Sequence, residues 1–178
     1  TTEVGIISLG SLNYGTSARV GGDKMDEAIA AFVRRRHNVI IGEGTAERIK
    51  IEIGSALATS EGTHILGCVR GQDVTRGVPC ELSLTQGDIV EALCEPLSQI
   101  VEVVCASLEQ AQPEIASDMI DRGITLTGGG SLLRNIDRVL ADETGLPVQV
   151  AETPLRCVAI GTGRVLEDQN LHETLCVA

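Results

Sequence analysis

The chain contains almost no aromatic residues: Tyr14 and Phe32 make up 1% of its 178 residues, and tryptophan is absent. Proteins that read single-stranded nucleic acid stack its bases on several aromatic side chains, so this class is excluded. Hydrophobic residues nevertheless reach 43% and charged residues 22%, a balance typical of folded domains. The sequence therefore predicts one large domain, or two small ones, with an aliphatic core.

Positive charge is also scarce. The formal net charge is −11, and residues 38–120 contain 13 acidic but only 4 basic side chains. An acidic chain without a basic stripe is unsuited to the phosphate backbone of DNA or RNA, so nucleic-acid partners are excluded. A nucleotide ligand stays open, because backbone N–H groups hold phosphates as readily as lysine or arginine does.

Metal-binding and disulfide patterns are missing too. The six cysteines never form Cys-x-x-Cys and the three histidines are scattered, so no zinc site is expected and no metal ligand is assigned. Cys94 and Cys105 fall on one predicted helix about 16 Å apart, too far for a disulfide. We expect reduced thiols in the cytosol. No apolar run approaches the roughly 20 residues of a membrane span. The chain starts at Thr1 inside a strand pattern, without a signal peptide, which indicates a fragment.

Hydrophobic periodicity predicts the first elements of the fold. Short β-rich runs at residues 4–9 and 12–20 indicate an antiparallel hairpin, and helical spacing predicts a helix over residues 23–37. Thr45 is expected to cap a second helix, whose apolar stripe runs from position 46 to Leu57.

Two strand-like runs at residues 64–70 and 78–84 lead into the longest predicted helix. Thr85-Gln86-Gly87-Asp88 resembles a capping box at its start, and apolar residues recur every three or four positions as far as Leu108. Pro96 lies inside this helix and should kink it or divide it in two.

The last third of the chain alternates strand and helix. Strand-like runs at residues 124–127 and 148–151 alternate with helical patterns at 132–140 and 155–166. Such alternation is typical of parallel strands covered by helices, so the expected class is α/β. We expect a hairpin followed by β-α-β-α units, with a small α+β insertion at about residues 38–85.

A glycine-rich turn, Thr127-Gly128-Gly129-Gly130-Ser131, lies between a predicted strand and a predicted helix. Three glycines let the backbone approach a ligand closely, and the helix that follows offers unpaired N–H groups. A tight turn that needs glycine for positive φ is an equally good interpretation. Walker A and Gly-x-Gly-x-x-Gly motifs are absent, so standard P-loop and Rossmann sites are excluded. Gly161-Thr162-Gly163 is expected to permit close helix packing.

Charged residues on the predicted helices allow two interpretations each. Glu47 and Lys50 can contact a ligand, but their i, i+3 spacing also suits an exposed ion pair of about 0.3 kcal/mol. Asp23 and Asp26 follow a Gly-Gly pair, where a helix cap and a dipole-stabilising acid explain them. Arg34-Arg35-Arg36 can form an anion or membrane patch, although a last helical turn explains them without one.

Several of these segments together resemble one family. Four motifs occur in the order and at the spacing of the MreB family of bacterial actin-like, rod-shape-determining ATPases: Arg19-Val20-Gly21-Gly22-Asp23, Glu47-Arg48-Ile49-Lys50, Leu126-Thr127-Gly128-Gly129-Gly130 and Gly145-Leu146-Pro147-Val148. The resemblance extends from Thr1 to about residue 168. Within the actin, Hsp70 and sugar-kinase superfamily, the second and third of these motifs are specific.

The resemblance implies an actin-like ATPase domain with an RNase H-like fold and a small α+β insertion subdomain. Residues 1–37 and 86–178 would form subdomain IIA, and residues 38–85 would form subdomain IIB. Thr1, with Thr2 beside it, would be the end of a phosphate loop that helps to position the attacking water. The resemblance therefore makes Thr1 and Thr2 the candidate catalytic residues.

Contacts with adenosine are implied at two further places. One is the family's adenosine-contacting helix, matched here by Glu47, Arg48, Ile49 and Lys50. The other is the family's second adenosine loop, matched here by Gly128, Gly129, Gly130 and Ser131.

The resemblance also implies a function. The family would bind ATP with Mg²⁺, assemble into filaments and determine rod shape by organising cell-wall synthesis. The expected partners are further copies of the protein, the wall-elongation machinery and the membrane, at whose inner, cytoplasmic face the filaments would lie. The family's N-terminal half, which carries the first phosphate loop and the membrane-binding segment, matches no part of the chain. Half of a cleft does not position nucleotide, metal and water, so the chain alone should not hydrolyse ATP.

Two other functions remain open at this point. One is a sugar or small-molecule kinase of the same superfamily, with a substrate pocket beside the γ-phosphate. The other is a non-catalytic, actin-like interaction module. The Glu47–Lys50 motif favours the cytoskeletal ATPase over the kinase.

Overall fold

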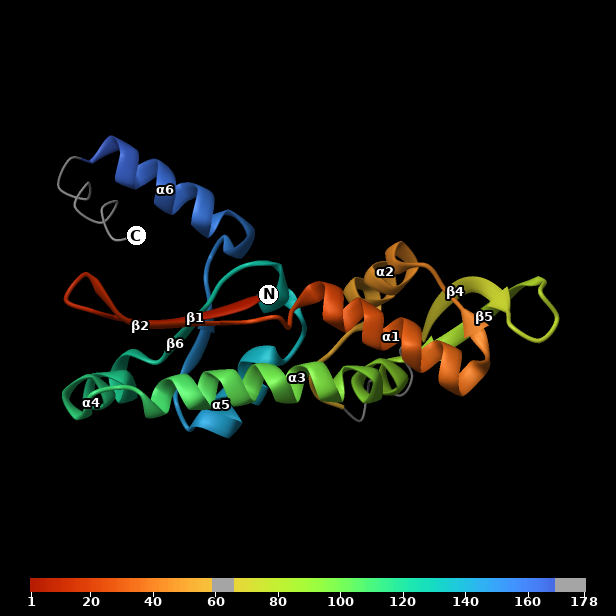
Figure 1. Cartoon of the computed structure of the whole chain (residues 1–178), viewed down its shortest axis with the longest axis horizontal. Coiled ribbons are helices and arrows are strands. Elements are labelled where there is room, and N and C mark those ends of the chain that lie inside the picture. The colour runs from red at the N-terminus through yellow and green to blue at the C-terminus, as the bar shows by residue number, and fades with distance from the viewer. Residues whose placement is uncertain (59–65, 169–178) are drawn as a thin grey trace.

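The computed structural model describes residues 1–58 and 66–168, which form an elongated molecule (Figure 1). It begins with an antiparallel hairpin of β1 (Thr2–Ser8) and β2 (Ser11–Ala18). Leu9 and Gly10 make the turn with φ angles of 52° and 80°, the left-handed values that tight hairpin turns require. The predicted hairpin is confirmed.

A helix, a short strand and a second helix follow: α1 (Gly22–His37), β3 (Val39–Ile40) and α2 (Glu43–Ile53). The prediction that Thr45 caps the second helix is wrong. Gly42 is the N-cap, and its carbonyl already accepts the Thr45 N–H at 3.0 Å, so Thr45 lies inside the helix. The predicted stripe also extends too far, because Leu57 lies beyond the end of α2.

The next two strands pair with β3. β4 (Leu66–Asp73) and β5 (Pro79–Thr85) form with it an antiparallel sheet in the order β3-β4-β5. These strands correspond to the predicted runs at 64–70 and 78–84, of which residues 64 and 65 lie outside the described residues. The sheet and α2 occupy one end of the molecule (Figure 1).

α3 (Gln86–Glu109) is the longest helix and opens with the predicted capping box. The Thr85 hydroxyl accepts the Asp88 N–H at 3.1 Å, and the Asp88 carboxylate accepts the Thr85 N–H at 2.8 Å. Of the two effects predicted for Pro96, division of the helix is wrong, because α3 is one continuous helix, and a kink stays a prediction. Pro96 removes a single backbone hydrogen bond, and buried side chains on both sides of it hold the helix against the core.

The remaining elements alternate helix and strand in the following order: α4 (Pro113–Arg122), β6 (Ile124–Leu126), a 3₁₀ turn (Gly129–Leu132), α5 (Ile136–Thr144), β7 (Val148–Val150), a second 3₁₀ turn (Pro154–Arg156) and α6 (Cys157–Glu167). β6 and β7 are parallel. α4 has no counterpart in the sequence prediction, and the helix predicted from position 132 begins at Ile136. The α/β class is confirmed.

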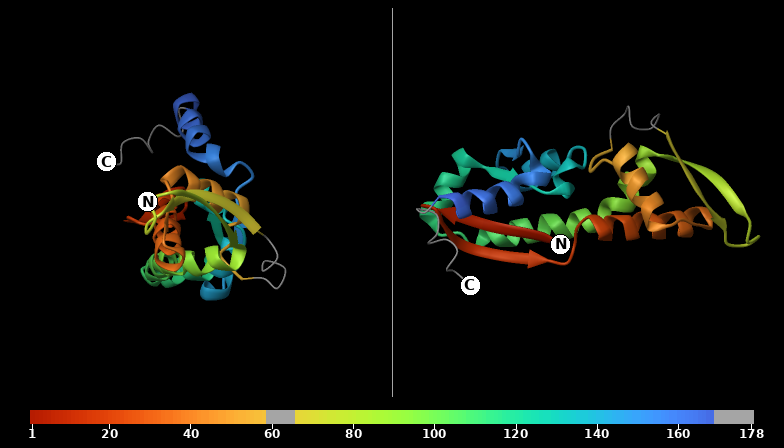
Figure 2. Two further views of the ribbon diagram at one scale, coloured as in Figure 1. Left: turned by 90° about the vertical axis from the view of Figure 1, so that its right-hand side faces the viewer. Right: turned by 90° about the horizontal axis from the view of Figure 1, so that it is seen from above.

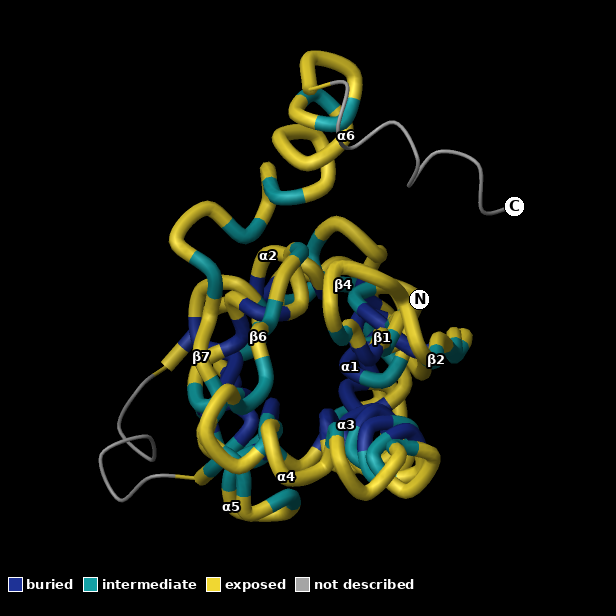
Figure 3. Tube along the Cα trace, turned by 90° about the vertical axis from the view of Figure 1, so that its left-hand side faces the viewer, coloured by how far each residue is buried: buried dark blue, intermediate teal, exposed yellow. Residues whose placement is uncertain are grey.

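One aliphatic core joins α1, α2, α3 and α5 with the strands. α3 packs against α1, β1 and β2, while α5 packs against β7 and α3. Figure 3 shows α3, α4 and α5 below both strand pairs, with β1 and β6 as the inner strands. Within the described ranges, neither β1 nor β6 has a hydrogen-bonded strand on its second edge. The inner edges of both strand pairs are therefore open, above one helical layer.

α6 stands apart from the rest of the described chain (Figures 1 and 2). None of its residues is buried, and Val158 is 75% exposed, with Leu166 similarly open. The expected close packing at Gly161 and Gly163 is wrong, because a Cβ added at either glycine would meet no described atom within 4 Å. Across residues 1–58 and 66–168, no helix is long and apolar enough to cross a membrane.

Candidate functional site

The start of β1 lies against the start of α1. The Thr2 hydroxyl donates to the Val20 carbonyl at 2.8 Å. A Cβ added at Gly21 would lie 2.8 Å from the Thr1 nitrogen, so only glycine permits this approach of the two backbones. Thr1 itself is exposed. The two candidate catalytic threonines therefore sit beside the Gly-Gly pair that opens α1.

Lys50 reaches the same place from α2. Its Nζ donates to the Gly22 carbonyl at 3.2 Å and lies 2.8 Å from Asp26 Oδ1 and 2.9 Å from Oδ2. The Lys50 and Asp26 side chains are only 15% and 12% exposed. This ion pair fixes the last turn of α2 against the first turns of α1.

Two interpretations of the charged residues are corrected by this pair. The exposed Glu47–Lys50 ion pair is wrong, because Lys50 turns inward to Asp26, which lies on a different helix. Asp26 is not a cap, since it lies inside α1 and is buried, whereas Asp23 does lie in the first turn. Burial raises the pKa of the Asp26 carboxyl, Lys50 lowers it in part, and the nearby Glu47 and Asp23 charges raise it further.

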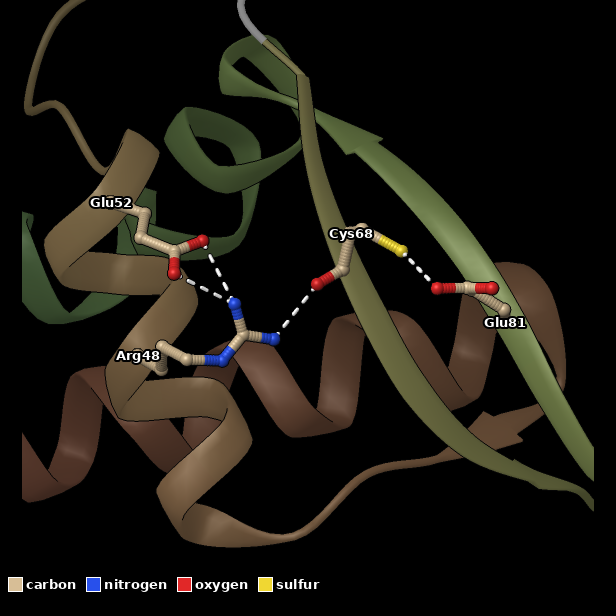
Figure 4. Close-up of polar contacts among 4 residues, drawn as sticks. All are labelled: Arg48, Glu52, Cys68 and Glu81. Atoms are coloured by element: carbon tan, nitrogen blue, oxygen red, sulfur yellow. Dashed lines mark hydrogen bonds and ion pairs between the residues drawn. The ribbon is translucent and has the colours of Figure 1, made fainter.

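Arg48 holds α2 to the sheet (Figure 4). Its guanidinium donates to both Glu52 carboxylate oxygens, at 2.7 and 2.9 Å, and to the Cys68 carbonyl at 2.8 Å. The Cys68 thiol donates to Glu81 at 2.8 Å, a hydrogen bond that raises the pKa of the thiol. Ile49 is fully buried in the core. In this structure Arg48 and the Ile49 side chain serve the fold, as Lys50 also does through Asp26, and ligand binding by Glu47, Arg48, Ile49 and Lys50 stays a prediction.

The glycine loop lies at the carboxyl end of β6. Gly128 has φ 79°, a left-handed value that favours glycine, and its carbonyl accepts the Ser131 hydroxyl at 2.7 Å. The backbone thus needs glycine for its turn, as the structural interpretation predicts. Gly130 faces open space, because an added Cβ would meet nothing within 4 Å. Room beside the turn leaves the ligand-binding interpretation equally compatible with the geometry.

The residues after this loop connect it to the end of α2. The Arg134 guanidinium donates to the Glu52 carbonyl at 3.0 Å, and the Asn135 amide donates to the Ser55 hydroxyl at 2.9 Å. Within residues 1–58 and 66–168, no hydrogen bond joins Gly128–Ser131 directly to Glu47 or Lys50. The fold therefore gathers the Thr1–Thr2 segment, Lys50 and the residues after the glycine loop around the C-terminal end of α2.

Sequence reasoning missed Asp26, Arg134, Asn135 and Ser55 as residues that position this site. The position of Asp26 near a helix start indicated only a local role, whereas its partner Lys50 lies 24 positions further along the chain. The Asn135–Ser55 contact spans 80 positions. No local pattern encodes either contact.

The site brings together groups that bind polar, anionic ligands. It combines an ammonium group, the Thr2 hydroxyl and the Thr1 backbone beside a helix start, and a glycine loop, and proteins use groups of these kinds for phosphate and ribose. Two surface grooves of the described chain lie elsewhere, one beside the end of α1 and one on the β1–β2 hairpin. The arrangement resembles one wall of a binding site.

A model of the MreB/Mbl protein family matches residues 1–174. The chain belongs to the MreB/Mbl family. It is 54% identical over 172 residues to the cell shape-determining protein MreB of Escherichia coli K12, which covers 97% of this chain and 49% of that protein. The chain thus spans about half the length of this MreB relative.

Solved structures agree with this assignment. MreB5 of Spiroplasma citri bound to ADP matches 93% of this chain and 50% of its own length, with a TM-score of 0.88 and 34% identity. The MamK double helical filament, at 18% identity, shows the same fold over 86% of this chain and 46% of its own, with a TM-score of 0.72. An actin-like fold is thereby confirmed for this MreB/Mbl chain.

Proposed function

We propose that this MreB/Mbl chain forms one lobe of an actin-like, nucleotide-dependent filament protein that determines rod cell shape. The observation that carries the proposal is the gathering of Thr1–Thr2, Gly21–Gly22 and Lys50 at one place in a fold that its relative MreB5 of Spiroplasma citri uses with ADP bound. Residues 1–37 and 86–178 would be subdomain IIA of this lobe, and residues 38–85 subdomain IIB.

ATP would lie against this wall. Thr1 and Thr2 would face the phosphates and the attacking water, because their hydroxyls stand beside the helix start. Glu47 and Lys50 would contact adenosine, and the Gly128–Ser131 loop would close on it from the other side. The Asp26 carboxylate would hold the Lys50 ammonium in place for that contact. Hydrolysis would need the opposite wall, since phosphoryl transfer depends on positioning from both sides.

Mg²⁺ would accompany the nucleotide, neutralising charge on its phosphates. The described residues offer it no cage, because no group of three or more histidine, cysteine, aspartate or glutamate side chains gathers there. The buried Asp26 carboxylate is occupied by Lys50. No step of the proposed chemistry is therefore assigned to a metal held by this chain.

A second lobe would cover the surfaces that this one leaves open. These surfaces are the free edges of β1 and β6 and the exposed apolar side chains of α6. A pair of three-residue parallel strands is not stable alone, since sheets of this kind are normally covered and extended. The chain's match to about half of its relatives' length supports the same arrangement.

The complete protein would work as a filament. Its partners would be further copies of itself, the wall-elongation machinery and the membrane, and the filaments would lie at the inner, cytoplasmic face of that membrane. The name of the Escherichia coli relative, a cell shape-determining protein, supports this role. Contact with the membrane would come from the lobe that this chain does not include.

The test is to fuse the N-terminal half of Escherichia coli MreB upstream of Thr1 and to measure ADP and AMPPNP binding by calorimetry. We expect the fused protein to bind at least about tenfold more tightly than the chain alone, and only the fused protein to release phosphate from ATP. Lys50→Ala should weaken binding, whereas Arg138→Ala, on the exposed face of α5, should not. A correctly folded fusion that binds neither nucleotide would contradict the proposal.

A further inference from the structure

A groove of about 570 Å³ runs between the second half of α1 and β3. Its floor is apolar and includes Ile40, Ile41 and Val74. Ile40 and Val74 are 45% and 43% exposed, so part of this floor is open to solvent. The volume is within the range of sites that accept part of another molecule.

One end of the groove is held in place where α1 meets the loop after β4. Asn38 caps the end of α1 in the left-handed conformation, with φ 57°. Its carbonyl accepts the Val74 N–H at 2.9 Å, and its side-chain amide donates to the Thr75 hydroxyl. The Asp73 carboxylate holds the same loop by accepting the Thr75 and Arg76 N–H groups at 2.8 and 2.9 Å. A groove that is ordered in this way costs less entropy to fill.

Two arginines without a counter-charge line the same groove. Arg34 and Arg35 are exposed, and neither forms an ion pair with any residue of the described ranges. Arg36 differs, because it lies 3.8 Å from Glu91 and over the Phe32 ring. The last turn of a helix favours cations at these positions but does not pair them. In a chain with a net charge of −11, they indicate a partner that brings carboxylates.

β3 (Val39–Ile40) is an edge strand beside this groove. It pairs with β4 on one side, and no strand within residues 1–58 and 66–168 pairs with its other side. No residue of β4 lines the groove, so the groove adjoins the unpaired side of β3. An open strand edge accepts an extended peptide, whose main chain forms hydrogen bonds and whose alternate side chains fill neighbouring pockets.

We propose that the groove binds an extended peptide of another protein in which acidic and aliphatic residues alternate. Successive side chains of a strand point to opposite faces. The aliphatic side chains would therefore lie on the floor at Ile40 and Val74, and the carboxylates would meet Arg34 and Arg35 at the rim. This site goes beyond the proposed function, because nucleotide binding does not use it.

Neither a second copy of the described chain nor a membrane matches the groove as well. The exposed acidic helix is α4, but Ile120 lies two positions after Asp118 and therefore on a different face of that helix. Its acidic and apolar side chains cannot enter one groove together. A membrane would need a broad basic face, whereas Arg34 and Arg35 flank a groove in a strongly acidic protein.

Fluorescence anisotropy with labelled synthetic peptides tests the site in the chain itself. One peptide alternates glutamate and leucine, a second has the same residues in two blocks, and a third alternates lysine and leucine. We expect the chain to bind the first peptide at least about tenfold more tightly than either of the others. General electrostatic attraction predicts tighter binding of the lysine peptide instead, because the chain has a net charge of −11.

Charge reversal in the groove should reverse this preference. Arg34→Glu with Arg35→Glu should weaken binding of the alternating glutamate peptide by about tenfold or more and strengthen binding of the lysine peptide. The matched control is Arg138→Glu with Arg164→Glu, which changes the net charge equally at exposed positions outside the groove and should bind like the parent. Ile40→Ser should also weaken binding, because it removes part of the apolar floor. Circular dichroism checks that each variant is folded, and Arg34→Gln with Arg35→Gln gives a milder form of the first.

Three results would overturn the proposal. They are equal binding of the alternating and block glutamate peptides, unchanged binding by the Arg34 and Arg35 variant, and use of these arginines for phosphatidylglycerol vesicles or for a second copy instead. Vesicle flotation and sedimentation velocity with the same variants detect the last result. Nucleotide binding by the fused protein uses other residues, so the proposed function keeps its own test.

Discussion

Removing the Lys50 ammonium leaves the Asp26 carboxylate buried without its counter-charge. We expect Lys50→Ala to lower the free energy of unfolding by about 1–3 kcal/mol even without ligand, the cost of an unsatisfied buried polar group. Burial already raises the Asp26 pKa above its usual 3.8, and the loss of Lys50 raises it further. A carboxyl whose pKa is raised by folding lowers stability as it ionises, that is, as pH increases above 3.8. The stability difference between Lys50→Ala and the parent should therefore be larger at neutral pH than near pH 4.

Urea unfolding at the two pH values measures this effect. Glu47→Ala is the matched control, because Glu47 lies on the same helix but is exposed. It should lower the free energy of unfolding by much less than Lys50→Ala does. Asp26→Asn combined with Lys50→Met should recover part of the loss, since the pair is then removed as a whole. A Lys50→Ala chain as stable as the parent at both pH values would contradict the assigned ion pair.

At the scale of single elements, α3 depends on its buried stripe. Leu97 is only 6% exposed and faces the core, so Leu97→Ala should lower the free energy of unfolding by about 2–5 kcal/mol. The matched control is Leu155→Ala, at an exposed leucine ahead of α6, which should cost far less. Denaturant unfolding measures both, and a Leu97→Ala loss below about 0.5 kcal/mol would mean that the stripe does not pack as described.

The start of α3 should make the free energy of unfolding depend on pH in the opposite direction to the dependence that Asp26 causes. Burial tends to raise the Asp88 pKa, but hydrogen bonds from the Thr85 backbone and hydroxyl, with the nearby charges of His37 and Arg36, lower it overall. A lowered carboxyl pKa contributes stability that is present above 3.8 and is lost as pH falls through the folded value.

Asp88→Asn should remove this contribution. We expect the difference in stability between the parent and the variant to be about 0.5–2 kcal/mol at neutral pH, as for other helix caps, and to shrink at pH values below 3.8. Thermal melts of the two proteins across the acid range measure that difference. A constant difference at all pH values would show that the carboxylate charge has no part in the cap.

Elements encoded by neighbouring residues could be predicted, and contacts between distant ones could not. The capping box of α3 depends on Thr85 and Asp88, three residues apart, and both bonds form as expected. α4 had a readable signal, Pro113 at its first position and Gly123 after its last, but its few apolar residues are not buried. The Asp26–Lys50 pair arises from packing between α1 and α2, which no periodicity reveals.

At the scale of the whole molecule, one lobe should not polymerise. This chain would offer only one lobe's share of the contacts that join subunits in the proposed filament. Copies with a net charge of −11 also repel one another at low salt. We therefore expect the isolated chain with ATP and Mg²⁺ to remain monomeric or weakly associated, without long filaments.

Light scattering and negative-stain imaging provide the measurement. The same assays with full-length Escherichia coli MreB present should show shorter filaments, because a chain bound at a filament end offers only half of the next contact. Bovine serum albumin at equal concentration controls for crowding. Long, regular filaments from the chain alone would contradict the two-lobe assembly, and an unchanged MreB filament length would contradict the end-blocking effect.

The bare apolar side of α6 also bears on how long this chain survives in a cell. Chaperones and proteases recognise exposed aliphatic side chains such as Val158 and Leu166, which normally mark an unfolded protein. A copy whose α6 is uncovered would be removed quickly, and a copy whose α6 is buried in an assembly would be spared. Degradation through the exposed face of α6 would thus limit the amount of this lobe to the amount of the partner that buries the helix.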